Sequence, residues 1–281
     1  MGTTCDSPSD DGPLDSGRVV AKPDVIELSD GIRIPILYED RSVLVIDKPA
    51  GWLLAPSHWR QTRRNLQGAL EADLLAGAFW ARARNLKFLR FVHRLDAETS
   101  GVLLLAKSRG AVGPLSELFE RREVEKRYLA VVHGTPAREQ WRCQEPIGDD
   151  PAGAGRMRVD RRTGKEAETW FRVLAARHHP RWGDLSLIEA LPLTGRTHQI
   201  RVHLQAGGHP VLGDWLYAGR SAALRPRPED SAPPLALRAA GLAYRDPFTR
   251  RDVRITAPCG PFVQPFFPAG SVNSIDHFPS R

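Results

Sequence analysis

Short apolar runs, each stopped by polar, glycine or proline residues, dominate the pattern of the chain from about residue 36 onward. They are rich in valine, leucine and isoleucine, which is typical of buried β-strands. The pattern predicts strands at residues 42–46, 88–92, 101–107, 128–132, 168–174, 185–190, 242–244 and 253–255. Turn residues lie between the members of each of the last two pairs, so we expect both pairs to form hairpins.

Three other segments carry apolar residues every three or four positions, which predicts helices. The first covers residues 62–77, the second ends near residues 121–122, and the third covers residues 197–206. In the third, Ile200 and Leu204 should face inward, with Gly207 ending the helix. Because strands outnumber helices and alternate with them irregularly, the sequence predicts an α+β fold with a mixed sheet.

The chain of 281 residues is long enough for one large domain or two modest ones. We expect a single domain over residues 31–270, followed by a C-terminal tail at residues 271–281. Residues 219–234 contain four prolines and are predicted to be a loop or insertion. No apolar run approaches the ~18 residues that a membrane helix requires, so we expect no membrane-spanning segment.

Residues 1–30 differ in composition from the rest of the chain. They hold seven acidic side chains against two basic ones, and few large apolar side chains precede Val25. Such a segment buries too little apolar surface to offset its ordering entropy. We therefore expect a flexible acidic tail, most of it before about residue 22. The alternative is an autoinhibitory mimic of nucleic acid.

The remainder of the chain is strongly basic. The whole chain carries a net charge of +7 and its first 30 residues carry −5, which leaves +12 on the other 251 residues. Arginine supplies 34 of the 40 basic side chains. A coding sequence that favours arginine codons explains this excess, and so does the suitability of arginine for phosphate contacts and base stacking. The positive charge favours an anionic macromolecule as the partner.

The cysteines give little sign of a disulfide or a metal site. Cys5, Cys143 and Cys259 lie far apart and lack the CxxC spacing of a structural zinc site. We therefore expect no bound metal and a reducing, cytoplasmic compartment.

The stretch HRLDAETSG at residues 93–101 is polar and lies between two predicted strands. Loops at the ends of buried strands often form active sites. Asp96 there could act as a nucleophile or as an acid–base group. The structural alternative is a turn in which Asp96 and Thr99 bond to backbone groups.

A second polar stretch, LTGRTHQIRVHLQ, covers residues 193–205. On a helix, Arg201 shares a face with His198, and such an arrangement suits a phosphate or carboxylate clamp. The alternatives are a solvated helix face and a metal site. The spacing of His198, His203 and His209 does not match the i, i+4 pair of a helical zinc site, so the metal site is disfavoured.

Together with two further segments, these stretches resemble the RluA-type pseudouridine synthase family. VLVIDKPAG at residues 43–51 is similar to the family's N-terminal strand and Lys-Pro-Gly turn, and VEKRYLAVVHG at residues 124–134 to its Lys-x-Tyr strand. TGRTHQIRVH at residues 194–203, followed by GHPVLGD at residues 208–214, is similar to its third motif. The resemblance extends over about residues 36–267.

The resemblance implies an enzyme that isomerises uridines in structured RNA, ribosomal or transfer RNA, by base flipping and without a cofactor or metal. It implies a central mixed, mainly antiparallel sheet with flanking helices and a basic cleft, and we expect a monomer. It assigns the essential aspartate to Asp96, the stacking and proton-abstracting tyrosine to Tyr128, and the arginine that pairs with the aspartate to Arg201. The predicted RNA- and substrate-binding residues are Arg94, His93, Thr99, Lys48, Arg196, His198 and Gln199.

The chemistry explains why these residue types are needed. The bond between C1′ and N1 of uridine must break, the base must turn, and C5 must bond to C1′. An aspartate that stays ionised where water is excluded needs a cation such as arginine beside it. The ring of Tyr128 can stack on the detached uracil. Basic side chains can offset the cost of flipping the nucleotide out of folded RNA.

The chain also departs from many relatives. Residues 237–239 read Leu-Arg-Ala where relatives often carry Leu-His-Ala. Many relatives also carry a small S4 RNA-binding domain before the catalytic domain, and we expect that domain to be absent here because the N-terminal segment is short. The single-domain layout and the segment at residues 51–53 lean slightly towards the branch that acts on transfer RNA. The rival functions are an inactive RNA-binding or assembly factor of the same fold and an aspartate-dependent glycosidase, which would need a second carboxylate such as Glu98.

Overall fold

The computed structural model describes residues 22–54, 64–153, 155–217, 233–268, 270, 272 and 275. The predictions for most of the acidic tail, the proline-rich segment and the C-terminal tail concern residues outside these ranges. Within the described ranges, no helix is long and apolar enough to cross a membrane.

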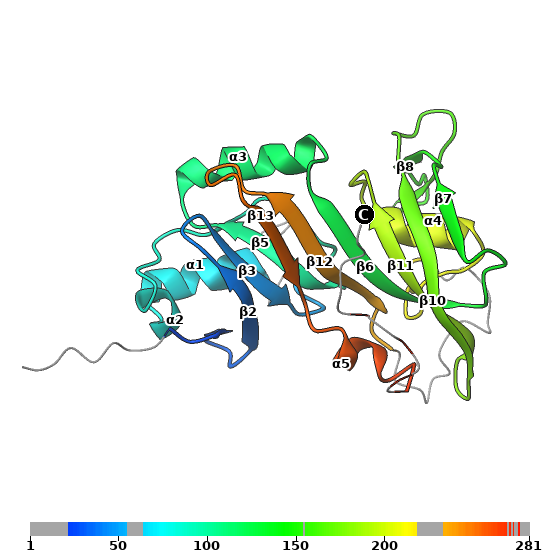
Figure 1. Ribbon diagram of the computed structural model, residues 1–281, viewed down its shortest axis with the longest axis horizontal. Helices are drawn as coiled ribbons and strands as arrows, with labels where there is room; N and C mark the ends of the chain where they lie inside the picture. The colour runs from blue at the N-terminus through cyan, green and yellow to red at the C-terminus, as the bar shows by residue number, and fades with distance from the viewer. Residues whose placement is uncertain are drawn as a thin grey trace, which may run out of the picture.

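A large sheet forms the body of the protein (Figure 1). Its strands follow the spatial order β1-β2-β3-β5-β12-β6-β11-β10-β7, with β13 beside β12 and β4 beside β5. The β5–β12 pair is parallel and the other pairs in this sheet are antiparallel. The strands are β1 (Val25–Glu27), β2 (Arg33–Glu39), β3 (Val43–Lys48), β4 (Arg90–Phe91), β5 (Ser100–Ala106), β6 (Glu125–His133), β7 (Gln140–Cys143), β10 (Thr169–His179), β11 (Gly183–Pro192), β12 (Leu237–Arg245) and β13 (Asp252–Thr256). The predicted α+β class with a mixed, mainly antiparallel sheet is confirmed.

Two predictions about the strands need correction. The sequence places residues 25–27 in the tail, yet they form β1, which pairs with β2, and Ile26 and Leu28 are buried. The boundary of the tail at residue 30 is therefore too late, because these apolar side chains complete the core. The run at residues 88–92 forms only the short β4, because just two of its residues pair with β5.

The three predicted helices are present as α1 (Leu66–Ala76), α3 (Arg109–Glu120) and α4 (Gln199–Ala206), with α2 (Phe79–Arg82) and α5 (Gly260–Val263) as further short helices. Asn65 caps α1 by accepting a hydrogen bond from the Gly68 N–H, and Gly77 ends it in the left-handed conformation. α4 begins later than predicted, because His198 takes a left-handed backbone conformation with φ 56° directly before it.

Side chains on the two faces of the sheet pack against different helices, because successive strand residues point to opposite faces. Leu44 of β3 belongs to an apolar cluster with Leu66 of α1, whereas the next residue, Val45, belongs to a cluster with Leu115 of α3. A third cluster joins β6 and β11 to α4 and includes Leu204. Figure 1 shows these helices around the sheet.

A second, small sheet consists of β8 (Ile147–Asp149) and β9 (Met157–Val159). It lies beside α4, where Ile147, Val202 and Tyr217 form an apolar cluster of their own. The small sheet therefore rests on the same helix that carries Arg201.

The parallel contact between β5 and β12 fixes the place of the first polar stretch. Gly101 of β5 has φ 112°, and a Cβ at this position would lie 2.1 Å from the carbonyl oxygen of Ala239. Any other residue would push the strands apart. This close approach holds the start of β5 and the residues 93–99 before it, which we name the Asp96 loop.

Candidate active site

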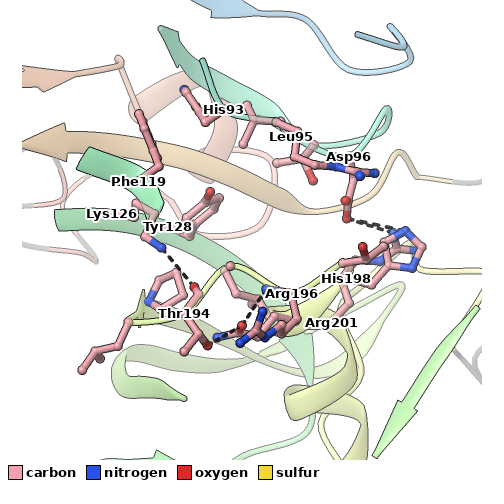
Figure 2. A pocket seen from close by; sticks show the side chains of 18 of the residues that line it. His93, Leu95, Asp96, Phe119, Lys126, Tyr128, Thr194, Arg196, His198 and Arg201 are labelled. Atoms are coloured by element: carbon pink, nitrogen blue, oxygen red, sulfur yellow. Dashed lines mark hydrogen bonds and ion pairs between the residues drawn. The ribbon is translucent and has the colours of Figure 1, made fainter. Parts of the chain in front are cut away.

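Asp96 and Arg201 meet although 105 positions separate them in the sequence (Figure 2). Nη1 of Arg201, on α4, donates a hydrogen bond to Oδ2 of Asp96 at 3.2 Å. The side chain of Arg201 is 8% exposed and that of Asp96 is 19% exposed. The carboxylate is therefore paired with a cation and still open to a bound molecule.

Arg201 has a second, closer carboxylate partner. Its Nε and Nη2 donate to the two oxygens of Asp214 at 2.7 and 2.8 Å, and Asp214 is buried. Such a two-pronged pair fixes the plane of the guanidinium group and leaves Nη1 for Asp96. The sequence assigned no role to Asp214, although this residue ends the segment at residues 208–214 that the sequence analysis singled out.

Tyr128 lines the same cavity from the central strand β6 (Figure 2). Burial, together with the nearby Asp96 carboxylate, raises the pKa of Tyr128 above its ordinary value. The hydroxyl group therefore keeps its proton at neutral pH. In this state Tyr128 offers a stacking surface and a hydrogen-bond donor.

Lys126 lies on the same face of β6, two positions before Tyr128, and also lines the cavity. Its Nζ donates to the carbonyl oxygen of Thr194 at 3.0 Å. Burial, with a smaller effect of Arg122, lowers the pKa of Lys126 to about 8. Lys126 thus ties β6 to residues 193–198, which we name the Arg196 loop. The sequence showed Lys126 within the Lys-x-Tyr strand but assigned it no role.

Lys48 holds the Asp96 loop and does not face the cavity. It is fully buried, and its Nζ donates to the carbonyl oxygens of Pro49, Ala97 and Thr99 at 2.7–2.9 Å. Burial lowers the pKa of Lys48 to about 8. All three ammonium protons are used within the protein, so the prediction that Lys48 binds RNA is wrong.

Gln199 is likewise engaged inside the protein, although it borders the cavity. Its oxygen accepts hydrogen bonds from the Thr194 hydroxyl and the Arg196 N–H, and its nitrogen donates to the Glu168 carbonyl and the Thr169 hydroxyl. The amide group has no free donor for RNA. The prediction that Gln199 binds substrate is therefore wrong, because its role is to hold the Arg196 loop.

His93 and Thr99 belong to the frame of the Asp96 loop. Nε2 of His93 accepts a hydrogen bond from the Leu104 N–H, and the ring stacks on Phe119 at 4.5 Å. Burial, with a smaller effect of Lys126, lowers the pKa of His93 to about 3, so the ring is neutral and carries no charge for RNA. Thr99 is buried and borders the cavity.

Arg94, Arg196 and His198 lie at the edge of the cavity. Arg94 is exposed and borders two cavities that meet at Asp96. Nε of Arg196 donates to the Glu166 carbonyl, which leaves the rest of its guanidinium group at the rim. His198 points Nε2 towards Oδ2 of Asp96 at 3.9 Å (Figure 2).

The two cavities that meet at Asp96 have volumes of about 420 and 970 Å³. The smaller one is bordered by Tyr128, Lys126 and the Arg196 loop, and the larger one extends towards Trp215 and Gln67. Asp96 thus stands between a compact pocket and a wider groove. A flipped base in the first and flanking nucleotides in the second would fit this arrangement.

Arg238 occupies the position where relatives often carry histidine. Its Nη2 pairs with Oδ2 of Asp47 at 2.6 Å, and its Nη1 donates to the Ser100 hydroxyl at 3.3 Å. The arginine therefore joins β12 to β3 and to the first residue of β5. Through Ser100, Arg238 holds the start of β5, the strand that directly follows the Asp96 loop.

The described residues hold no cluster of three or more histidine, cysteine, aspartate or glutamate side chains that could bind a metal ion. His203, one of the three histidines considered for a metal, pairs instead with the Thr169 hydroxyl at Nδ1 and the Glu145 carbonyl at Nε2. It belongs to the same internal network as Gln199.

Comparisons with known proteins agree with this geometry. The sequence model of the RNA pseudouridylate synthase family matches residues 42–206. The chain is 40% identical over 191 residues to an uncharacterized RNA pseudouridine synthase, YhcT, of Bacillus subtilis, which covers 68% of this chain and 60% of the relative. It is 36% identical over 226 residues to ribosomal large subunit pseudouridine synthase C of Escherichia coli, covering 79% and 66%. The chain thus spans less than two thirds of the length of these relatives.

Two solved human structures share the fold. RNA Pseudouridylate Synthase Domain Containing 1 superposes with a TM-score of 0.64 at 27% identity, covering 88% of this chain and 87% of the other. RNA Pseudouridylate Synthase Domain Containing 4 superposes with a TM-score of 0.61 at 26% identity, covering 79% and 87%.

Proposed function

Because the chain belongs to the RNA pseudouridylate synthase family, we propose that it isomerises uridine to pseudouridine in structured RNA. The observation that carries this proposal is the meeting of Asp96, Arg201 and Tyr128 at one cavity. A carboxylate held by an arginine, next to an aromatic ring, provides the groups that the reaction needs.

The isomerisation is balanced without a co-reactant. The N1–C1′ bond breaks, the C5–C1′ bond forms, C5 loses its proton, and N1 gains one. Asp96 supplies the carboxylate, and Arg201 holds it from Oδ2. The ring of Tyr128 can retain the detached uracil by stacking while the base turns.

The substrate class that we favour is large-subunit ribosomal RNA. Its support comes from the names of the relatives and from the +12 charge of residues 31–281. Arg94 and Arg196 at the cavity rim are suited to phosphate contacts. Ribosomal RNA is therefore better supported than the transfer RNA towards which the sequence leans, and it agrees with a cytoplasmic location.

The two rival functions have less support. An inactive RNA-binding factor has no need for a carboxylate that an arginine holds beside a base-sized cavity. A glycosidase needs a second carboxylate aimed at the same bond, and Glu98 is exposed and borders the wider groove rather than the compact pocket.

The test uses transcripts of large-subunit ribosomal RNA labelled with tritium at C5 of uridine, which releases tritium into water when C5 bonds to C1′. Asp96→Asn should abolish release while keeping the fold and RNA binding, and the matched control Glu98→Gln should retain activity. Release by Asp96→Asn within ~tenfold of the wild type would refute the assignment.

A further inference from the structure

Tyr217 and His198 form a hydrogen-bonded chain that leads to Asp96. Oη of Tyr217 accepts a hydrogen bond from the Met157 N–H at 2.9 Å and lies 2.8 Å from Nδ1 of His198. On the other side of the imidazole ring, Nε2 lies 3.9 Å from Oδ2 of Asp96. The chain therefore connects the first residue of β9 with the carboxylate.

These contacts favour one tautomer of His198. The Met157 N–H already points at the Tyr217 oxygen, and Nδ1 of His198 is the acceptor available to the hydroxyl proton among the described residues. Nδ1 then accepts, and Nε2 bears the ring proton. Burial lowers the pKa of His198 below its ordinary value, which keeps the ring neutral at pH 7.

The Nε2–H group is thus directed at Oδ2 of Asp96, the oxygen that Arg201 also holds. We propose that His198, oriented by Tyr217, is a positioning residue that holds Oδ2 of Asp96 and leaves Oδ1 for the uridine. At 3.9 Å the contact is electrostatic, and catalytic contacts commonly tighten when substrate binds. The inference rests on the proposed function, because it concerns how that carboxylate is aimed.

The backbone conformation at His198 limits which residues can replace the histidine in a test. Its φ of 56° and ψ of 20° are left-handed, a conformation that is unfavourable for most residues other than glycine. Asparagine is among the residues that tolerate it best. His198→Asn therefore preserves the backbone and an acceptor near the Nδ1 position, while it removes the Nε2–H group.

Charged groups surround His198 from several elements. Asp96 and Asp214 favour a charged ring, whereas Arg201 and Arg94 oppose it. From the side of β9, the guanidinium of Arg156 lies 5.4 Å from the centre of the Tyr217 ring. Loss of the Tyr217 hydroxyl would remove the proton donor to Nδ1 and leave that nitrogen open to a proton.

The experiment measures tritium release from the labelled ribosomal transcript as a function of pH. Tyr217→Phe keeps the ring, which contacts Arg201 at 5.0 Å, and removes only the hydroxyl. We expect kcat to fall about tenfold with KM unchanged, and to fall further as the pH is lowered and an imidazolium forms beside Asp96.

His198→Asn should also lower kcat, without this added pH dependence. The double variant should be no slower than His198→Asn alone, because both changes act through one side chain. Tyr244→Phe is the matched control. It removes another buried tyrosine hydroxyl, one without a hydrogen-bond partner among the described residues, and should behave as the wild type.

Wild-type kcat and pH profile in both Tyr217→Phe and His198→Asn would overturn the inference. A rise in KM alone would also overturn it, because it would assign both residues to RNA binding. If His198→Asn fails to fold, the kcat and pH profile of Tyr217→Phe decide the question. Tritium release that is absent from the wild type would instead refute the proposed function.

Discussion

The two loops that form the site are anchored in different ways. The carbonyl groups of the Asp96 loop share one side-chain donor, since the ammonium group of Lys48 donates to Ala97 and Thr99 within that loop and to Pro49 outside it. The Arg196 loop depends on several side chains, because Gln199, Lys126 and Thr194 each contribute hydrogen bonds. One substitution, at Lys48, should therefore loosen the Asp96 loop. One substitution at the Arg196 loop should remove only some of the hydrogen bonds that hold it.

The anchors of the two loops also differ in charge. The anchor of the Asp96 loop is a buried cation, whose protonation depends on pH, whereas the amide of Gln199 does not titrate. The position of Asp96 thus depends on a charged group on each side, Lys48 within the loop and Arg201 opposite it.

The largest effect is expected from Arg201→Met, which removes the group that joins the Asp96 loop to α4. It leaves the buried Asp214 carboxylate without its partner, which typically costs about 3–5 kcal/mol of stability. Urea unfolding should show this loss, and tritium release should be abolished. Arg201→Lys should recover only part of both, because lysine lacks the forked geometry. Wild-type stability of Arg201→Met would show that Asp214 does not depend on this pair.

Tyr128 lies on β6, and Lys126 on the same face ties that strand to the Arg196 loop. Tyr128→Phe keeps the stacking ring and removes the hydroxyl group. If the hydroxyl moves a proton or bonds to the reacting uridine, the rate of tritium release should fall about 10²-fold. Single-turnover measurements with saturating enzyme separate this effect from RNA binding. An unchanged rate would restrict Tyr128 to stacking.

Lys48→Met and Gln199→Leu compare the two anchors directly. Lys48→Met leaves three carbonyl groups without their donor and should cost about 2–3 kcal/mol, whereas Gln199→Leu should cost about 1–2 kcal/mol. Urea unfolding measures both. Lys48→Met should mainly lower kcat through Asp96, and Gln199→Leu should mainly weaken RNA binding through Arg196. Equal losses of unfolding free energy in the two variants would show that the two loops are anchored equally strongly.

The pH dependence of stability sharpens the same comparison. The pKa of Lys48 is about 8 in the folded protein against its ordinary 10.5, so the unfolded chain binds more protons between these pH values. The free energy of unfolding gains a contribution from Lys48 that rises with pH across this window and is lost as the pH falls towards 8. Lys48→Met should remove this contribution, and Gln199→Leu should not.

The smallest effects are expected at the rim. Arg94→Gln on the Asp96 loop and Arg196→Gln on the Arg196 loop should each weaken RNA binding and reduce the salt slope of log K by about 0.7–0.9. Filter binding of the labelled transcript between ~50 and 200 mM salt measures both. An unchanged slope in either variant would remove that arginine from the phosphate contacts.

Much of the fold followed from local patterns. The strand runs and the three helical segments appear nearly where the spacing of apolar residues predicts them, because burial of one face is a property of neighbouring positions. The prediction failed at residues 25–27 because the burial of these residues depends on distant parts of the chain. Ile26 and Leu28 form too short an apolar pattern to stand out beside acidic neighbours, and they are buried because a distant core is there to receive them.

The site residues show the same division between what local pattern predicts and what distant contacts decide. Lys48 and Gln199 were both candidates for binding, yet they turned out to be internal anchors. A polar side chain looks the same in sequence whether its partner is RNA or a buried carbonyl group. The sequence therefore identified the segments that form the site, but not which side chains are free in it.

By itself the sequence determined the alternation of strands and helices, the basic character of the body, and the segments that carry Asp96, Tyr128 and Arg201. Only the tertiary structure decided that Arg201 also pairs with Asp214, and that a chain of contacts runs from Tyr217 to His198. The physical reason is that a buried polar group must find its hydrogen-bond partner wherever the fold brings one within 3 Å or so. Such partners come from segments far apart in the chain, and their spacing in the sequence carries no information about their distance in space.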